Sequence, residues 1–285
     1  MVAVVLSAGK SRGALLLLAA ALVAGLLACP LSAIAAGDVE AQLRAAASGA
    51  HRSPANRERD LYRHPVETLL FFGIKPDMTV VEIYPGSGWY TEILAPFLKE
   101  RGKLFAASWD RDNEPERVRQ NLDRFHEKLR ANPEAYSGVA VTALSRHKTE
   151  IAPRGSADMV LTFRNIHNWM KTGFDGIVFR AMYDALKPGG VLGVVEHRGN
   201  PEVWQDPQAL SGYVNEEHVV QLAEAAGFRL AARSEINANA KDTKDYPEGV
   251  WTLPPTLRLK DKDRDKYMAI GESDRMTLKF VKPEK

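Results

Sequence analysis

Val80–Tyr90, with the sequence VVEIYPGSGWY, is the stretch that decides the fold. It opens with a β-branched run that carries one acid, which predicts a buried strand. Two glycines follow, and they predict a sharp turn into a helix that starts near Gly88. A plain tight turn without a ligand is the alternative interpretation of these glycines. Glycine accepts positive φ and lets a ligand approach the backbone closely. Because a helix N-terminus also attracts carboxylates and phosphates, this stretch is a candidate cofactor loop.

Composition and length indicate one globular core, because 45% of the 285 residues are hydrophobic and 26% are charged. The N-terminus has a different pattern. Lys10 and Arg12 precede an apolar run over residues 13–27, and Ala33-Ile34-Ala35 follows it. This is the layout of a secretory signal peptide over residues 1–35, cleaved before Ala36. The run is shorter than the roughly 20 residues that cross a bilayer, so we expect no stable membrane span. The protein is therefore expected to be periplasmic or secreted.

A second interpretation of the same segment stays open. Residues 26–29, Leu-Leu-Ala-Cys, resemble a bacterial lipobox, which would anchor the protein to lipid through Cys29. Cys29 is the only cysteine, so cleavage before Ala36 leaves no thiol and no disulfide.

Cleavage also removes two positive charges and lowers the formal net charge from +2 to 0. Nucleic acid is therefore not expected as a partner, and the oligomeric state is left open.

Strands alternate with helices along the rest of the chain. Residues 36–64 predict a helical N-terminal extension, in which the charge run Arg57–Asp60 is expected to be a solvated helix face. Residues 65–285 predict the main domain, and its first helix begins near Pro65 and ends at Gly73. Further helices are expected over residues 89–98, 115–129 and 174–186 and after the cap Asn215, and further strands over 103–108, 139–144, 157–163, 191–196, 228–235 and 276–281. This order predicts a mostly parallel sheet covered on both faces.

Polar clusters stand at the carboxyl ends of four predicted strands, where ligands bind in such sheets. These clusters are Tyr84–Gly88, Ser108–Asp110, Arg164–Trp169 and Glu196–Arg198. A long insert, residues 236–274, separates the last two strands and contains an alternating charge run over 260–266 that is typical of a solvated surface. Loops of this length are uncommon unless they act as lids or carry their own structure, so the insert is a possible lid.

The spacing of the glycines distinguishes between cofactors. A nicotinamide fingerprint requires a third glycine, and Thr91 stands in its place. An acid inside the strand, Glu82, followed by Gly86 and Gly88, instead resembles the first motif of class I S-adenosylmethionine-dependent methyltransferases. The turn Leu186–Gly190 before the fifth strand and the ending Lys279-Phe280-Val281 agree with that family. The resemblance covers roughly residues 65–283 and is closest to predicted exported bacterial methyltransferases.

This resemblance implies an α/β, Rossmann-like fold, with a seven-stranded mostly parallel sheet, an antiparallel last strand and helices on both faces. It also implies S-adenosylmethionine as cofactor. By the resemblance, Glu82 orients the loop, and Gly86 and Gly88 admit the methionine end of the cofactor. Tyr84 stands where the family has its first glycine. Ser108 stands where the family has an acid for the ribose hydroxyls, and Asp110 is its possible substitute.

The resemblance places Asn165 and His167 under the sulfonium or beside the methyl acceptor. His167 suits a general base, although a structural role is the alternative. His197, the second catalytic candidate, could bind an acidic acceptor together with Arg198, or both could cap the sheet edge. No metal ligand is assigned. The function expected is methyl transfer to a small-molecule acceptor. The alternatives are an exported non-catalytic binding protein on the same fold and a nucleotide-dependent oxidoreductase.

Overall fold

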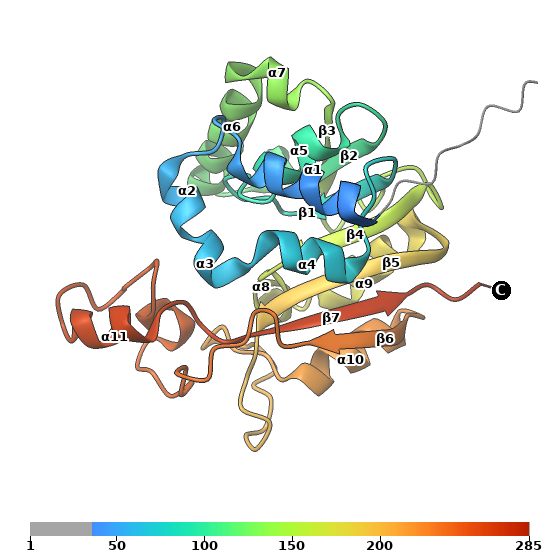
Figure 1. The fold of residues 1–285 in the computed structure, drawn as a ribbon. Coiled ribbons are helices and arrows are strands. Elements are labelled where there is room, and N and C mark those ends of the chain that lie inside the picture. Colours follow the sequence, from blue (N-terminus) through green and yellow to red (C-terminus); the bar gives the residue numbers. More distant parts are fainter. Residues whose placement is uncertain (1–35, 285) are drawn as a thin grey trace, which may run out of the picture. The chain divides into compact units, whose positions relative to one another are not determined.

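The computed structural model describes residues 36–284. Their strands form one seven-stranded sheet (Figure 1). Its strand order is β3-β2-β1-β4-β5-β7-β6. Neighbours among the first five strands pair in parallel, whereas β7 pairs antiparallel with both β5 and β6. The predicted sheet with an antiparallel last strand is thereby confirmed. The strands are β1 Thr79–Ile83, β2 Lys103–Trp109, β3 Val139–Leu144, β4 Ala157–Phe163, β5 Leu186–His197, β6 Arg229–Ser234 and β7 Arg275–Val281.

Helices cover both faces of this sheet. Alternate residues of β1 point to opposite faces: Val81 and Ile83 join the apolar cluster that includes α9, whereas Glu82 contacts Thr91 of α5 on the other side. The main-domain helices are α4 Pro65–Phe72, α5 Thr91–Leu98, α6 Glu116–Ala131, α7 Pro133–Tyr136, α8 Ile166–Thr172, α9 Asp175–Ala185 and α10 Glu216–Ala225. A 3-10 turn, η1 (Arg111–Asn113), precedes α6. The bounds of α4, β3 and β4 agree with the prediction.

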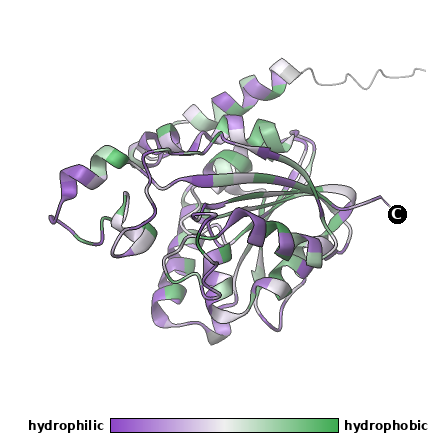
Figure 2. Ribbon diagram, turned by 90° about the horizontal axis from the view of Figure 1, so that it is seen from below, coloured by the Kyte–Doolittle hydropathy of each residue, from purple (hydrophilic) through white to green (hydrophobic). Residues whose placement is uncertain are grey.

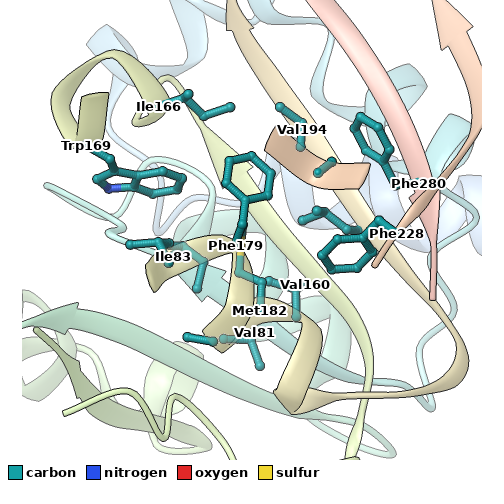
Figure 3. Packing of buried hydrophobic residues seen from close by; sticks show 14 of the residues in the cluster. Val81, Ile83, Val160, Ile166, Trp169, Phe179, Met182, Val194, Phe228 and Phe280 are labelled. Atoms are coloured by element: carbon teal, nitrogen blue, oxygen red, sulfur yellow. The ribbon is translucent and has the colours of Figure 1, made fainter. Parts of the chain in front are cut away.

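The main core lies between the sheet and α8 to α10. Phe179 and Met182 of α9 pack against Val81, Val160 and Val194 of three neighbouring strands, and all five side chains are buried (Figure 3). Burying side chains of this size stabilises the fold by about 1.5–3 kcal/mol each. This core fixes the strand ends, and with them the groups that follow each strand.

The N-terminal extension contains α1 Ala36–Ser48, α2 Pro54–Glu58 and α3 Asp60–Arg63. Its charge run is not the solvated face that we predicted. Arg57 and Glu58 are exposed, but Asp60 pairs with the buried Arg52, and Arg59 pairs with Glu272. A charge run cannot reveal partners that lie this far along the chain.

The insert between β6 and β7 carries its own short elements, η2 Gly249–Thr252 and α11 Arg264–Ile270. Its charge run is exposed as expected and is hydrophilic in Figure 2. Asn215 does precede α10, but its side chain does not cap the helix: Nδ2 donates to the carbonyl of Val203 instead.

No helix among the described residues is long and apolar enough to cross a membrane. The predicted signal peptide, residues 1–35, and the alternative anchor Cys29 lie outside the described residues.

Candidate active site

In the loop between β1 and α5, three residues at every second position have positive φ. They are Tyr84 (φ 46°), Gly86 (φ 61°) and Gly88 (φ 81°). Gly88 is needed for packing, because a Cβ there would lie 3.0 Å from the Phe125 ring. Gly86 differs, because no atom lies within 4 Å of where its Cβ would be. The backbone at Gly86 is thus open to a ligand, as the glycine pattern predicts.

Glu82 ties this loop to the start of α5. Its carboxylate accepts a 2.6 Å hydrogen bond from the hydroxyl of Thr91, and both residues are buried. Burial raises the pKa of Glu82 to about 7, because the charged form is poorly solvated, and the Thr91 hydrogen bond only partly opposes this. Thr91, whose presence argues against a dinucleotide fingerprint, therefore has a positive role as the anchor of the acid.

Tyr84 occupies a left-handed backbone conformation that glycine adopts readily and a bulky side chain adopts only with strain. Two contacts hold it there. Its ring stacks on Trp109 with centroids 4.6 Å apart and planes at 15°, and its hydroxyl donates to the carbonyl of Leu144 at 2.8 Å. Burial raises the pKa of the hydroxyl, so it stays a donor. Tyr84 thus combines a positive φ with an aromatic side chain in the wall of the loop.

A cavity of about 370 Å³ opens above the carboxyl ends of β1, β4 and β5. Glu82, Tyr84 and Gly86 line it from β1 and its loop, and Asn165, His167 and His197 line it from β4 and β5. Asn165 is fixed there because Nδ2 donates to the carbonyl of Ile83 at 3.0 Å. Trp251, Pro254 and Pro255 of the insert form part of the wall.

Three of the residues predicted for the site do not line this cavity. Gly88 packs against Phe125, and Ser108 is buried. The Asp110 carboxylate is engaged by Lys148 at 2.7 Å and by Ser145 at 3.3 Å. Trp109, which stands between Ser108 and Asp110, lines the cavity instead. Successive residues of a strand point to opposite sides, so when Trp109 faces the cavity its neighbours do not.

His167, in the first turn of α8, forms a buried pair with Glu196. Its Nδ1 lies 3.1 Å from Oε1 of Glu196, whose other oxygen accepts from the backbone N–H of Ile166 at 2.6 Å. A carboxylate only accepts hydrogen bonds, so Nδ1 of His167 carries the proton and Nε2 is left as the basic atom. The glutamate thereby fixes the ring in the orientation and tautomer of a general base.

His197 follows Glu196 and also lines the cavity. Its Nδ1 lies 2.5 Å from the hydroxyl of Ser273. Burial first, then the nearby His167 and Arg275, hold the pKa of His197 well below its usual range, so the ring is neutral. Arg198 does not join the cavity, because it pairs with Glu235 and Asp274.

Within the described residues, His167, Glu196 and His197 also form a group whose potential metal ligands lie within 4.8 Å of one another. The surroundings argue against an ion. Each Glu196 oxygen already has two donors: Oε2 faces the N–H groups of Ile166 and His167, and Oε1 faces the N–H of His197 and Nδ1 of His167. A metal ligand needs a free lone pair directed at the ion, so we interpret the group as a carboxylate–histidine pair beside a second histidine.

Four arginines of the cavity wall were not identified from the sequence: Arg59, Arg63, Arg164 and Arg275. Three of them surround one buried carboxylate, Glu272. Arg59 and Glu272, for example, are 213 residues apart and meet at 2.6 Å. No local pattern marks such a pair, and only Arg164 belonged to a predicted cluster.

We expect the Glu82→Gln substitution to remove a pH dependence of stability. A pKa of about 7 in the fold, above its ordinary 4.5, means that the folded protein binds more protons between these values. The free energy of unfolding of the wild type therefore falls as the pH rises from about 4.5 to about 7, by about 3 kcal/mol from this group. Glutamine has no such proton to lose. Urea unfolding across this range measures the difference between the two proteins, and a difference independent of pH would contradict the assignment.

Comparisons with known proteins support the fold. Solved structures similar to this chain include an S-adenosylmethionine-dependent methyltransferase from Aquifex aeolicus, with 16% identity and a TM-score of 0.53 over 88% of this chain and 100% of the other. Another is the [4+2]-cyclase SpnF, with 13% identity and a TM-score of 0.54 over 84% of this chain and 86% of the other. No protein-family model and no curated protein matches the chain.

These likenesses define the class of fold. The described residues have the Rossmann-like fold of class I methyltransferases, and their last strand, β7, is antiparallel to its neighbours. The second structure is named for a cyclisation, so proteins of this fold do not all share one reaction. The function must therefore be argued from the site.

Proposed function

We propose that the cavity binds S-adenosylmethionine and that the protein transfers its methyl group to a small-molecule acceptor. The observation that carries this proposal is the β1–α5 loop: a buried acid, Glu82, anchors it, and the backbone at Gly86 is open to the cavity. A cavity of about 370 Å³ is within the range of small-molecule sites.

The residues present fit this cofactor in most respects. The open backbone at Gly86 would admit the methionine end, and the start of α5 would favour its carboxylate. Tyr84 and Trp109 offer a flat aromatic wall for a purine ring. The ribose hydroxyls would lack the acid that the family supplies after the second strand, because Asp110 is engaged by Lys148.

The chemistry requires little covalent help from the protein. A bound sulfonium supplies an electrophilic methyl group and a neutral leaving group. The chain must hold the acceptor in line with it and exclude water, which is a matter of proximity and alignment. Asn165 would fix one side of the reacting centre, since its amide is held by the carbonyl of Ile83. Trp251 and Pro254 of the insert would cover it from solvent.

His167 would act when the acceptor atom carries a proton. Its Nε2 would take that proton, and Glu196 would stabilise the imidazolium that forms. His197, neutral and partly buried beside it, would avoid adding a second positive charge at this point. We also propose that the protein is exported, on the pattern of residues 1–35.

Titration calorimetry on the purified protein tests the cofactor. S-adenosylmethionine, S-adenosylhomocysteine and a nicotinamide dinucleotide are titrated in turn. We expect heat from both sulfur compounds and none from the dinucleotide. No heat from either sulfur compound at millimolar concentration would rule out the proposal, and binding without turnover over a panel of acceptors would favour a binding protein on this fold.

A further inference from the structure

Four arginines gather in one part of the cavity wall. Arg63 is the last residue of α3, and Arg59 directly precedes that helix. Arg164 comes from the turn after β4 and Arg275 from the start of β7. Arg63 and Arg275 are only 4% and 2% exposed. Placing four guanidinium groups together in a buried wall is unfavourable unless negative charge balances them.

The described residues balance this charge only in part. Glu272 accepts from Arg59 at 2.6 Å and from Arg63 at 3.3 Å, and it also pairs with Arg275. One carboxylate thus pairs with three of the four arginines. Among the described residues, Arg164 has no ion pair, and the buried Nε of Arg275 has no hydrogen-bond partner.

The lowered basicity of this group agrees with unbalanced charge. Burial, followed by repulsion from Arg275, lowers the pKa of Arg164 to about 10. Burial and the charge of Arg164 likewise hold the pKa of Arg63 well below its usual range. Donors left unsatisfied in a buried wall that opens to a cavity are typical of a binding site, where the ligand supplies the missing partner.

The arginines extend from the cofactor loop to the far side of the cavity. The Arg63 guanidinium lies 4.7 Å from the ring of Trp89 in that loop, whereas Arg275 lies at the start of β7. Arg275 is the register partner of His197 on the neighbouring strand, and the N–H of Arg164 donates to Val195 of β5. Arg164 and Arg275 therefore stand over β4, β5 and β7. The glycine loop follows β1, which is three strand spacings, about 14 Å, from β7 and one spacing from β4, the strand that Arg164 follows. His167 lies between the two regions, on the helix that follows β4.

We propose that the methyl acceptor is a small organic anion whose carboxylate or phosphate group is bound by Arg164, Arg63 and Arg275. The role of the anion as methyl acceptor rests on the proposed function. The existence of the anion site rests on the arginines alone. Planar guanidinium groups match the oxygens of carboxylates and phosphates, and they bind them in pairs. With its anionic group on the arginines, the acceptor would extend toward His167, which is where the proton of its reactive atom would be received.

Calorimetry with simple anions tests this site. Inorganic phosphate and succinate are titrated separately into protein saturated with S-adenosylhomocysteine, with sodium chloride holding the ionic strength constant. We expect at least one of the two to bind, and the two titrations distinguish a phosphate site from a carboxylate site. If neither binds better than chloride, the proposal is wrong.

Substitution of Arg164 distinguishes a binding role from a structural one. We expect Arg164→Gln to weaken anion binding by about tenfold or more, because it removes charged hydrogen bonds. Arg164→Lys, which keeps the charge but loses the planar fork, should give a smaller loss. The melting temperature of Arg164→Gln should not fall, because the substitution relieves repulsion within the cluster. Arg229→Gln is the matched control, since Arg229 is exposed on β6, and it should bind like the wild type.

The affinity for S-adenosylhomocysteine, measured on the same variants, separates this inference from the proposed function. We expect Arg164→Gln to bind S-adenosylhomocysteine with unchanged affinity. An equal loss of affinity for the anion and for S-adenosylhomocysteine would show that the arginines hold the cofactor, which overturns the inference and leaves the function intact. Anion binding in a wild type that does not bind S-adenosylhomocysteine would refute the cofactor proposal and leave the anion site standing.

Discussion

Glu272→Gln is expected to destabilise the protein by about 3–5 kcal/mol, the cost of leaving buried charges without their partner. Glu272 is 2% exposed and pairs with Arg59, Arg63 and Arg275. Glutamine keeps the shape but removes the carboxylate that pairs with these three arginines. The expected loss is a large part of the 5–15 kcal/mol by which a domain of this kind is stable. Urea unfolding at neutral pH measures it.

The same carboxylate predicts a pH dependence of stability. Burial alone would raise its pKa, but Arg275, Arg63 and Arg59 outweigh burial and hold the pKa of Glu272 well below its usual 4.5. The folded protein therefore binds fewer protons than the unfolded chain as the pH falls below about 4.5, and stability is lost over that range. Glu272→Gln should not show this acid-dependent loss.

Glu248→Gln is the control for both experiments. Glu248 lies in the same insert and pairs with Arg258, but both side chains are more than two-fifths exposed. Exposed pairs of this kind contribute less than about 1 kcal/mol. If Glu272→Gln destabilised the protein no more than Glu248→Gln, the account of the arginine cluster as a buried, under-compensated group would be wrong.

Gly86→Leu is expected to weaken binding of S-adenosylhomocysteine by at least about 100-fold, which corresponds to about 2.8 kcal/mol. The side chain would occupy the open space beside the backbone at Gly86, where no atom lies within 4 Å of the added Cβ. It would also adopt a φ of 61°, at a cost of about 1–2 kcal/mol in stability. Calorimetry measures the affinity and urea unfolding the stability.

Gly155→Leu separates these two effects. Gly155 has nearly the same φ, 64°, and the same open surroundings, but it lies before β4, at the opposite end of the strand from the cavity. Both variants should lose similar stability, and only Gly86→Leu should lose binding. Equal affinities in the two variants would mean that the cofactor site has been misplaced.

The sequence was sufficient to predict the sheet, because the core is built from local patterns. Runs such as residues 139–144 and 157–163 are strands with the predicted bounds, and Pro65 and Gly73 mark the ends of α4 as expected. These signals depend on neighbouring residues alone. The residues that follow the predicted strands also come together: Tyr84, Asn165, His167 and His197 all line one cavity.

The charges of the site could not be predicted in the same way. Glu272 and its partners Arg59 and Arg63 are more than 200 residues apart, and their pairing depends on how the N-terminal extension meets the start of β7. The direction of a side chain at a strand end was also beyond the pattern. The position of Ser108 and Asp110 was identified, yet Trp109 faces the cavity, because successive strand residues point to opposite sides and Asp110 is engaged by Lys148.

A crystal structure of the protein with S-adenosylhomocysteine tests the central claim most directly. The account predicts that the ligand lies against the open backbone of Gly86, with its purine beside Tyr84 and Trp109 and its sulfur directed toward His167. A ligand bound elsewhere on the protein, or crystals that stay free of ligand after soaking at millimolar concentration, would contradict it.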